Sequence, residues 1–429
     1  MQRYTVTTLD GGERIVTEPV SSVRSVAIGI WIGAGSRDET SGQEGVSHLL
    51  EHLLFKGSAR YSAMEIAQIF DGLGGELNAA TAKEYTVVYA RVLDAHLETA
   101  LDVMTDMLLQ PQFEPGEIDS ERAVVLEEIA MYEDTPQDLV HDLIAKAVFA
   151  GHPLGKPVIG SAEVVAGASA EDIRAYHRSR YVGPNIVVSA AGNLEHEPLA
   201  HEIETRFAPL SRGPDDTVGV RPVWVGDAAP RSVFQRKDTE QVHLCLGGLG
   251  VSRSDRRRFA ASLLDSMLGG SASSRLFQEI REQRGMAYSV YTYGSQYADT
   301  GQVGVYVGTR EDNLAECVRI IGDQLGRMGE GRFEPAELAR AKENLKGRIM
   351  LSMESTSNRA SRLGKSVLTD TEILSLDRIC AEIDAVEPEA ISALARQLFA
   401  PERLSAAAIG PNEERFSDAV ALLNPALAA

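Results

Sequence analysis

The sequence predicts an α+β protein made of two similar α/β-sandwich domains in tandem. Helix-length and strand-length segments alternate along a chain of 429 residues, which is long enough for two sizeable cores. The second half repeats the apolar pattern of the first, and a stretch rich in Pro and Gly separates the halves. We therefore expect an N-terminal domain over 1–210, a linker over 211–231 and a C-terminal domain over 232–429.

The internal repeat is clearest at two places. Phe-Glu-Pro occurs at 113–115 and again 220 residues later at 333–335. The stretch HLLEH at 48–52 aligns with SLLDS at 262–266, at an offset of 214. Both alignments keep apolar residues opposite apolar residues, as two copies of one domain would.

In the first half, β-branched, aromatic and apolar runs predict strands, and longer segments with helical spacing predict helices. Gly11-Gly12 is the hairpin signal between the first two strands, and 71–81 is a Gly-rich stretch. The expected strands are 4–8, 14–17, 25–32, 85–92 and 185–191. One expected helix carries the HLLEH motif, and the others cover 95–110, 115–133, 137–149, 170–180 and 195–207.

The strongest chemical signal is the stretch SHLLEHLLFKG at 47–57. It favours a helix, on which His48 and His52 lie on the same face and could hold one metal ion. Two neutral imidazoles suit zinc, and a catalytic zinc needs one further protein ligand and an open position for water. Glu51 lies beside the histidines, where it could take a proton from that water. The pattern H-x-x-E-H is the inverted form of the common zinc-peptidase helix.

The further ligand is expected in the acidic stretch SERAVVLEEIAMYED. Glu121 and Glu128 share a helix face, whereas Glu127 is turned by about 100° from Glu128. We assign Glu128 as the ligand and Glu121 as a carboxylate that orients a histidine. In the repeat Arg348 and Ala341 replace these acids, which disappear together with the two histidines. A shared metal site predicts such a joint loss.

With these residues the chain resembles the pitrilysin/insulinase family of inverted zinc peptidases, including the β subunit of mitochondrial processing peptidase and its bacterial relatives. The resemblance covers nearly the whole chain, including DGLGGELNAAT, GHPLGKPVIG and LFQEIREQRGMAYSV. It implies one Zn²⁺ per chain, held by His48, His52 and Glu128, with Glu51 as the general base. It also implies that each chain is half of a peptidase clamshell that encloses a peptide chamber.

The resemblance further implies residues that hold the substrate. Arg281 and Tyr288 match, in spacing and setting, an Arg and a Tyr of the family's catalytically silent half, with Arg284 as the near competitor. Asn78 and Ala79 match the segment that binds substrate as an added β-strand.

The composition of the chain limits which binding partners and which cellular compartment we expect for the protein. The net charge of −20 argues against nucleic acid, and fits either a solvated acidic surface or an acidic chamber that attracts basic peptides. The longest apolar stretch, 26–34, is too short to span a membrane, and the first residues have no apolar signal region. Cys245, Cys317 and Cys380 show no C-x-x-C spacing and fit free thiols in a reducing cytosol, so we expect a cytoplasmic protein.

We therefore expect a zinc metallo-endopeptidase that hydrolyses short or unfolded peptides in an enclosed chamber. One alternative is a processing peptidase of narrow specificity for basic leader peptides. Another is a structural or assembly subunit like the respiratory-complex core proteins of the family, against which the intact ligand set and Glu51 argue. We expect a homodimer, with a heterodimer with a related subunit as the alternative.

Overall fold

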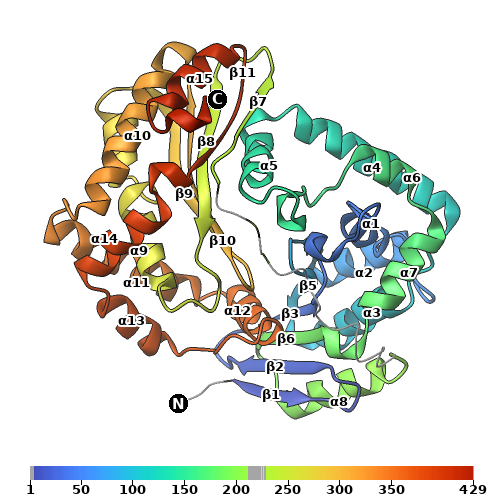
Figure 1. The fold of residues 1–429 in the computed structure, drawn as a ribbon. Helices are drawn as coiled ribbons and strands as arrows, with labels where there is room; N and C mark the ends of the chain where they lie inside the picture. Colours follow the sequence, from blue (N-terminus) through green and yellow to red (C-terminus); the bar gives the residue numbers. More distant parts are fainter. Residues whose placement is uncertain (1–3, 211–223, 225, 227–228, 429) are drawn as a thin grey trace. The chain divides into compact units, whose positions relative to one another are not determined.

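The computed structural model describes residues 4–210, 224, 226 and 229–428. Its strands form two β-sheets (Figure 1). Most of the expected linker over 211–231 lies outside the described residues. The chain divides into two units, each built around one sheet. The first unit contains Met1–Ala130, Lys156–Pro222 and Leu351–Ile373, and the second contains Met131–Gly155, Val223–Met350 and Leu374–Ala429.

The sheet of the first unit has the strand order β1-β2-β6-β3-β5-β4. β2 and β6 run parallel, and the other neighbouring pairs are antiparallel. The five strands expected in this half are present, with ends shifted by at most two residues. The strands are β1 (Thr5–Thr8), β2 (Arg14–Pro19), β3 (Ser25–Ile32), β4 (Glu76–Thr81), β5 (Thr86–Leu93) and β6 (Ile186–Gly192).

Side chains alternate across this sheet because successive strand residues point to opposite faces. In β3, Val26, Ile28 and Ile30 belong to the main core, which the unit's helices enclose, whereas Trp31 belongs to a second apolar cluster on the other face. The helices are α1 (Val46–Leu53), α2 (Ala63–Leu73), α3 (Leu97–Leu109), α4 (Pro115–Glu133), α6 (Ala162–Gly167), α7 (Ala170–Arg180) and α8 (His196–Phe207).

Helix α2 and strand β4 were not expected as elements from the sequence. Ser62 accepts a hydrogen bond from the backbone N–H of Glu65, and the Glu65 side chain accepts one from Ser62, so the pair forms a capping box at the start of α2. Gly74 ends α2 in the left-handed conformation with φ of 60°. The Gly-rich stretch is therefore the end of a helix and the turn into an edge strand.

The second unit repeats this topology with the strand order β7-β11-β8-β10-β9. β7 and β11 run parallel, as β2 and β6 do, so the two sheets match strand for strand apart from the additional β1. The internal repeat expected from the sequence is confirmed. The strands are β7 (Ser232–Arg236), β8 (Val242–Gly250), β9 (Ala287–Gln296), β10 (Gly301–Thr309) and β11 (Ser405–Gly410).

Helices enclose a second apolar core on one face of this sheet. None of the helices in the described part of the chain is both long and apolar enough to cross a membrane. The helices of this unit include α9 (Arg258–Leu268), α10 (Leu314–Gly329), α11 (Pro335–Ser352), α13 (Leu376–Asp384), α14 (Pro388–Leu398) and α15 (Glu413–Ala421).

Two helices cover the sheet of the other half of the chain. Helix α5 (Pro136–Val148) follows the first-half helices but packs on β8 and β11, and α12 (Thr356–Leu368) follows α11 but packs on β2, β3 and β6 (Figure 1). The two helices begin 220 residues apart, so they occupy equivalent places in the repeat. The exchange is therefore reciprocal, and the ranges 1–210 and 232–429 describe the repeat along the sequence rather than the units in space.

Each exchanged helix covers the apolar face that the main core leaves bare. Leu363 of α12 joins Trp31, Val87 and Val187, and Ile144 of α5 joins a cluster on the second sheet. The backbone of α12 comes close to the first sheet, since a Cβ added at Gly364 would lie 2.1 Å from the indole nitrogen of Trp31. Apolar patterning predicts such helices but does not tell which sheet they cover.

Candidate metal centre

Helix α1 places the H-x-x-E-H motif between a packed side and an open side. Leu49, Leu50 and Leu53 are buried in the core of the first unit. The helix begins after Gly45, whose φ of 97° is a left-handed conformation that glycine adopts readily. With the leucines packed inward, His48, Glu51 and His52 remain only partly buried on the other side of the helix.

The beginning of α1 is held by a buried acid that the sequence analysis did not identify. Glu39 accepts hydrogen bonds from the backbone N–H groups of Gly45 at 3.0 Å and Ser47 at 2.8 Å. Its carboxylate is favourable there because the helix N-terminus carries partial positive charge. Glu39 is only 5% exposed, and burial raises its pKa to about 7 although the hydrogen bonds lower it. An acid seven residues before the first residue of a helix is a weak signal in a sequence.

His48, His52 and Glu128 come together as the sequence predicts. Their ligand atoms lie within 4.8 Å of one another, and no other such group of three occurs among the described residues. A Glu128 carboxylate oxygen is 3.5 Å from Nε2 of His52 and 3.9 Å from Nε2 of His48. Two imidazoles and a carboxylate are a donor set that zinc accepts. Burial, and to a lesser extent the charge of His52, lower the pKa of His48 to about 4, so its imidazole stays neutral as metal binding requires.

Glu51 has the environment expected of a general base. Its Oε2 is buried and has no hydrogen-bond partner in the described part of the chain. Burial raises the pKa of Glu51, while hydrogen bonds from Thr81 at the end of β4 act in the opposite direction. An unpaired buried oxygen beside three candidate ligands fits a position where a water molecule and a metal ion would bind.

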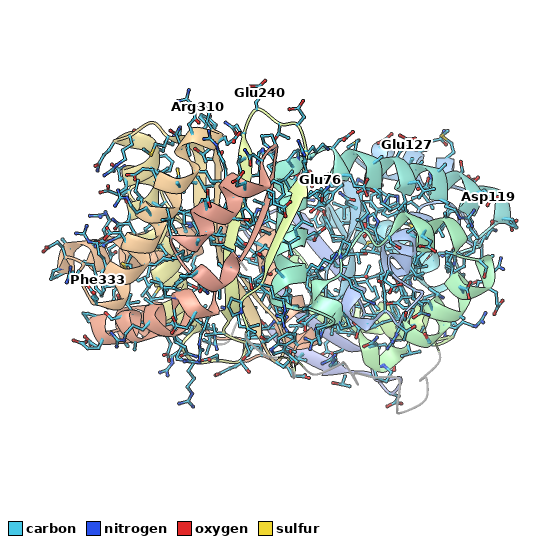
Figure 2. The ribbon with its side chains drawn as sticks, turned by 45° about the horizontal axis from the view of Figure 1, so that its top comes forward. Glu76, Asp119, Glu127, Glu240, Arg310 and Phe333 are labelled. Carbon is cyan, nitrogen blue, oxygen red and sulfur yellow. The ribbon has the colours of Figure 1, made fainter. Side chains whose placement is uncertain are left out.

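The two other acids considered on α4, Glu121 and Glu127, have different environments: Glu121 contacts His52, whereas Glu127 is exposed to solvent. Glu121 is 4% exposed and accepts a hydrogen bond from Nδ1 of His52 at 3.1 Å, which directs Nε2 of that ring toward Glu128. Glu127 is exposed on α4 (Figure 2), and it is not a member of the group formed by His48, His52 and Glu128. The sequence analysis missed Lys56, whose ammonium lies 2.5 Å from the second carboxylate oxygen of Glu121.

The predicted substrate residues Arg281 and Tyr288 lie together in the second unit. Arg281 sits on a short π-helix, Phe277–Glu282, with its guanidinium carbon 4.7 Å from the Phe277 ring centre and 4.6 Å from that of Tyr288. Tyr288 is 75% exposed near the start of β9. Arg284 instead pairs with Glu279 at 2.5 Å. The geometry couples Arg281, and not its competitor Arg284, to Tyr288.

Asn78 and Ala79 lie on β4, the edge strand of the first sheet. Asn78 is exposed, and its side-chain oxygen accepts a hydrogen bond from the N–H of Ala79 at 2.8 Å. Ala79 points into the core and is 8% exposed. β5 pairs with one side of β4, and as the last strand in the sheet order β4 offers its other side for strand addition.

Comparisons with known proteins agree with this geometry. The family model described as Insulinase (Peptidase family M16) matches residues 14–162, and the model described as Peptidase M16 inactive domain matches 167–345. An uncharacterized zinc protease of Streptomyces coelicolor is 43% identical over 97% of this chain and 92% of its own length. The uncharacterized zinc protease YmxG of Bacillus subtilis is 42% identical over 96% of this chain and 98% of its own length.

Solved structures share the fold. A protease from Helicobacter pylori superimposes with a TM-score of 0.89 at 21% identity, covering 95% of this chain and 99% of that one. A peptidase M16 inactive domain from Pseudomonas fluorescens also has a TM-score of 0.89 at 21% identity, covering 96% and 99%. Identity above 40% along almost the whole chain is decisive: the protein belongs to the insulinase family, peptidase family M16, and is a zinc protease.

Proposed function

We propose that this protein is a metallo-endopeptidase that hydrolyses short or unfolded peptides in an enclosed chamber, with Glu51 as the general base. The observation that carries the proposal is the buried, unpaired carboxylate oxygen of Glu51 beside His48, His52 and Glu128. A peptidase needs a group there to accept a proton from the attacking water.

His48, His52 and Glu128 would hold one zinc ion per chain. Bound there, zinc would supply the Lewis acidity that polarises the scissile carbonyl and acidifies a water molecule. Glu51 accepts the proton of that water and passes it to the leaving amine, which its raised pKa favours.

The remaining site residues act on the peptide. The free edge of β4 at Asn78 and Ala79 would bind an extended segment through backbone hydrogen bonds, which recognise an unfolded chain largely independently of its sequence. Arg281 and Tyr288, already joined by a cation–π contact, would hold the substrate from the silent repeat. Neither strand addition at β4 nor binding by Arg281 and Tyr288 would restrict the enzyme to substrates with one narrow sequence motif.

We place the enzyme in the cytoplasm as a homodimer, since two-fold homodimers are the commonest oligomers. Scattering-based mass measurement during size-exclusion chromatography tests this assembly, for which we expect twice the 46.4 kDa chain mass. An active enzyme with the mass of one chain would contradict the dimer.

The experiment that tests the function is digestion of a mixture of synthetic peptides, analysed by mass spectrometry. We expect internal cleavage at many sequences, loss of cleavage after zinc chelation and recovery after zinc is added back. A folded protein containing the same sequences should resist. Cleavage confined to basic leader-like peptides would instead indicate a narrow processing peptidase, and no cleavage by the zinc-loaded protein would indicate a structural subunit.

A further inference from the structure

A lysine, a carboxylate and an imidazole form a continuous chain beside the candidate metal centre. The ammonium of Lys56 is 2.5 Å from one oxygen of Glu121, and the other oxygen of Glu121 is 3.1 Å from Nδ1 of His52. The Glu121 side chain is 5% exposed, whereas that of Lys56 is 33% exposed. Lys56 therefore reaches from the protein surface to a carboxylate that is almost fully buried.

The turn that follows α1 holds Lys56 in this place. The N–H of Lys56 donates to the carbonyl of Leu53 at the end of the helix, at 3.1 Å. Gly57 then adopts φ of 117°, and its carbonyl accepts from the N–H of Gln112 at 3.2 Å. Gln112 lies just before α4, the helix that carries Glu121. The turn is thus tied to the segment that sets the position of Glu121.

We propose that Lys56 is a positioning residue for the metal centre, acting on His52 through Glu121; the inference rests on the proposed zinc chemistry. A carboxylate only accepts hydrogen bonds, so Glu121 requires the Nδ1–H form of His52 and leaves Nε2 free to bind metal. The ammonium fixes the carboxylate from its other oxygen. Without Lys56 that oxygen loses its partner in a buried place, and the carboxylate is free to turn away from His52.

The effect of removing Lys56 on zinc affinity has opposite signs for a purely electrostatic role and for a positioning role. The ammonium is a positive charge near a site for a divalent cation, so its removal would by itself strengthen zinc binding. Positioning predicts weaker binding, because loss of an outer partner of a metal-bound histidine typically costs about 10–100-fold in affinity. The two explanations differ in the sign of the change.

The test compares Lys56→Met and Lys56→Arg with Lys156→Met. Lys156 is a matched control: its side chain is 35% exposed and pairs with Glu44 at 2.7 Å, but this pair is not bonded to a histidine. We expect zinc affinity, measured by competition with a chelating dye, to fall about 10-fold in Lys56→Met. Lys56→Arg keeps a charged donor and should retain most of the affinity, and Lys156→Met should match the wild type.

A second readout needs no metal. Nitrogen NMR of the metal-free, histidine-labelled protein should show His52 in the Nδ1–H form in the wild type and in a mixture of tautomers in Lys56→Met. Lys56→Gln, which keeps a neutral donor, should lie between them and serves if Lys56→Met does not fold. Equal or tighter zinc binding in folded Lys56→Met (or in Lys56→Gln, where Lys56→Met does not fold), or an unchanged His52 tautomer in that variant, would overturn the inference. A wild type that binds no zinc would instead defeat the proposed function.

Discussion

Helices α1 and α9 occupy equivalent places in the two units, and differ in chemistry while sharing their packing. Leu49 and Leu50 of α1 align with Leu263 and Leu264 of α9, and all four are at most 1% exposed. On the other side, serines at 262 and 266 replace the two histidines. The buried side thus specifies the repeated fold, and the polar side is free to gain or lose a metal site.

The acid in the middle of each helix keeps much of its environment. Asp265 aligns with Glu51, and each has one buried carboxylate oxygen without a partner among the described residues. Burial raises the pKa of both acids, while a threonine hydrogen bond lowers it in each. The difference is in charge: Arg348, which replaces Glu128, lowers the pKa of Asp265 electrostatically. The second unit therefore has a positively charged side chain, Arg348, at the position of the proposed anionic ligand Glu128 of the first unit.

The largest expected effect distinguishes these two acids. Glu51→Gln should lower peptide hydrolysis by about 10²–10⁴-fold, the usual contribution of a general base, while the protein keeps its zinc. Asp265→Asn should leave the rate unchanged because, among the described residues, the one group of three candidate metal ligands lies in the first unit and not around Asp265. Initial rates with a quenched fluorescent peptide, together with zinc analysis of each variant, provide the measurement. If both variants lost activity equally, the assignment of one active and one silent unit would be wrong.

A second test compares neighbouring acids on α4. Glu128→Gln should weaken zinc binding by more than about 100-fold, since even outer partners of metal ligands contribute about 10–100-fold. Glu127→Gln should be silent because Glu127 is exposed (Figure 2) and is not a member of the group of candidate ligands. Zinc content after dialysis against a mild chelator measures the effect. Metal loss from Glu127→Gln alone would place the ligand one residue earlier.

A third test concerns Glu39, which holds the start of α1. Burial raises the pKa of Glu39 from 4.5 to about 7 in the folded protein, so the native state binds an additional proton between these pH values. Stability therefore falls as the pH rises through this window, by up to about 3 kcal/mol. Glu39→Gln lacks this titration and should gain stability relative to the wild type between pH 4.5 and 8. Urea unfolding of both proteins across this pH range measures the difference between their free energies of unfolding. A difference that does not change with pH would contradict the raised pKa of Glu39.

A smaller effect distinguishes the exchanged helix α12 from an ordinary surface helix. Gly364→Ala places a Cβ 2.1 Å from the indole nitrogen of Trp31 and should cost about 1–3 kcal/mol. Gly326→Ala in α10 is the control: a Cβ there meets nothing within 4 Å, so the change should stabilise by about 0.5–1 kcal/mol. Thermal unfolding measures both. An unchanged melting temperature for Gly364→Ala would contradict the close packing of α12.

The sequence predicts those features that depend on local pattern. Runs of β-branched, aromatic and apolar residues located five of the six strands of the first sheet, and helical spacing placed Glu128 rather than Glu127 beside the histidines. The prediction from sequence missed α2 and β4 because glycines interrupt the residue pattern between the end of this helix and the short strand. The exchange of α5 and α12, and the contacts of Glu39 and Lys56, depend on segments brought together only by the fold. Such contacts leave no periodic signal in a sequence.

The most direct test converts the polar side of α1 into that of α9. The double variant His48→Ser, His52→Ser gives the first unit the serines of the second while keeping the packed leucines. Zinc per chain, measured by plasma mass spectrometry on protein purified without added metal, should be one for the wild type and zero for this variant, with equal unfolding temperatures in the presence of chelator. A wild type with no zinc, or a double variant that still holds one, would contradict the assignment of the metal centre to His48, His52 and Glu128.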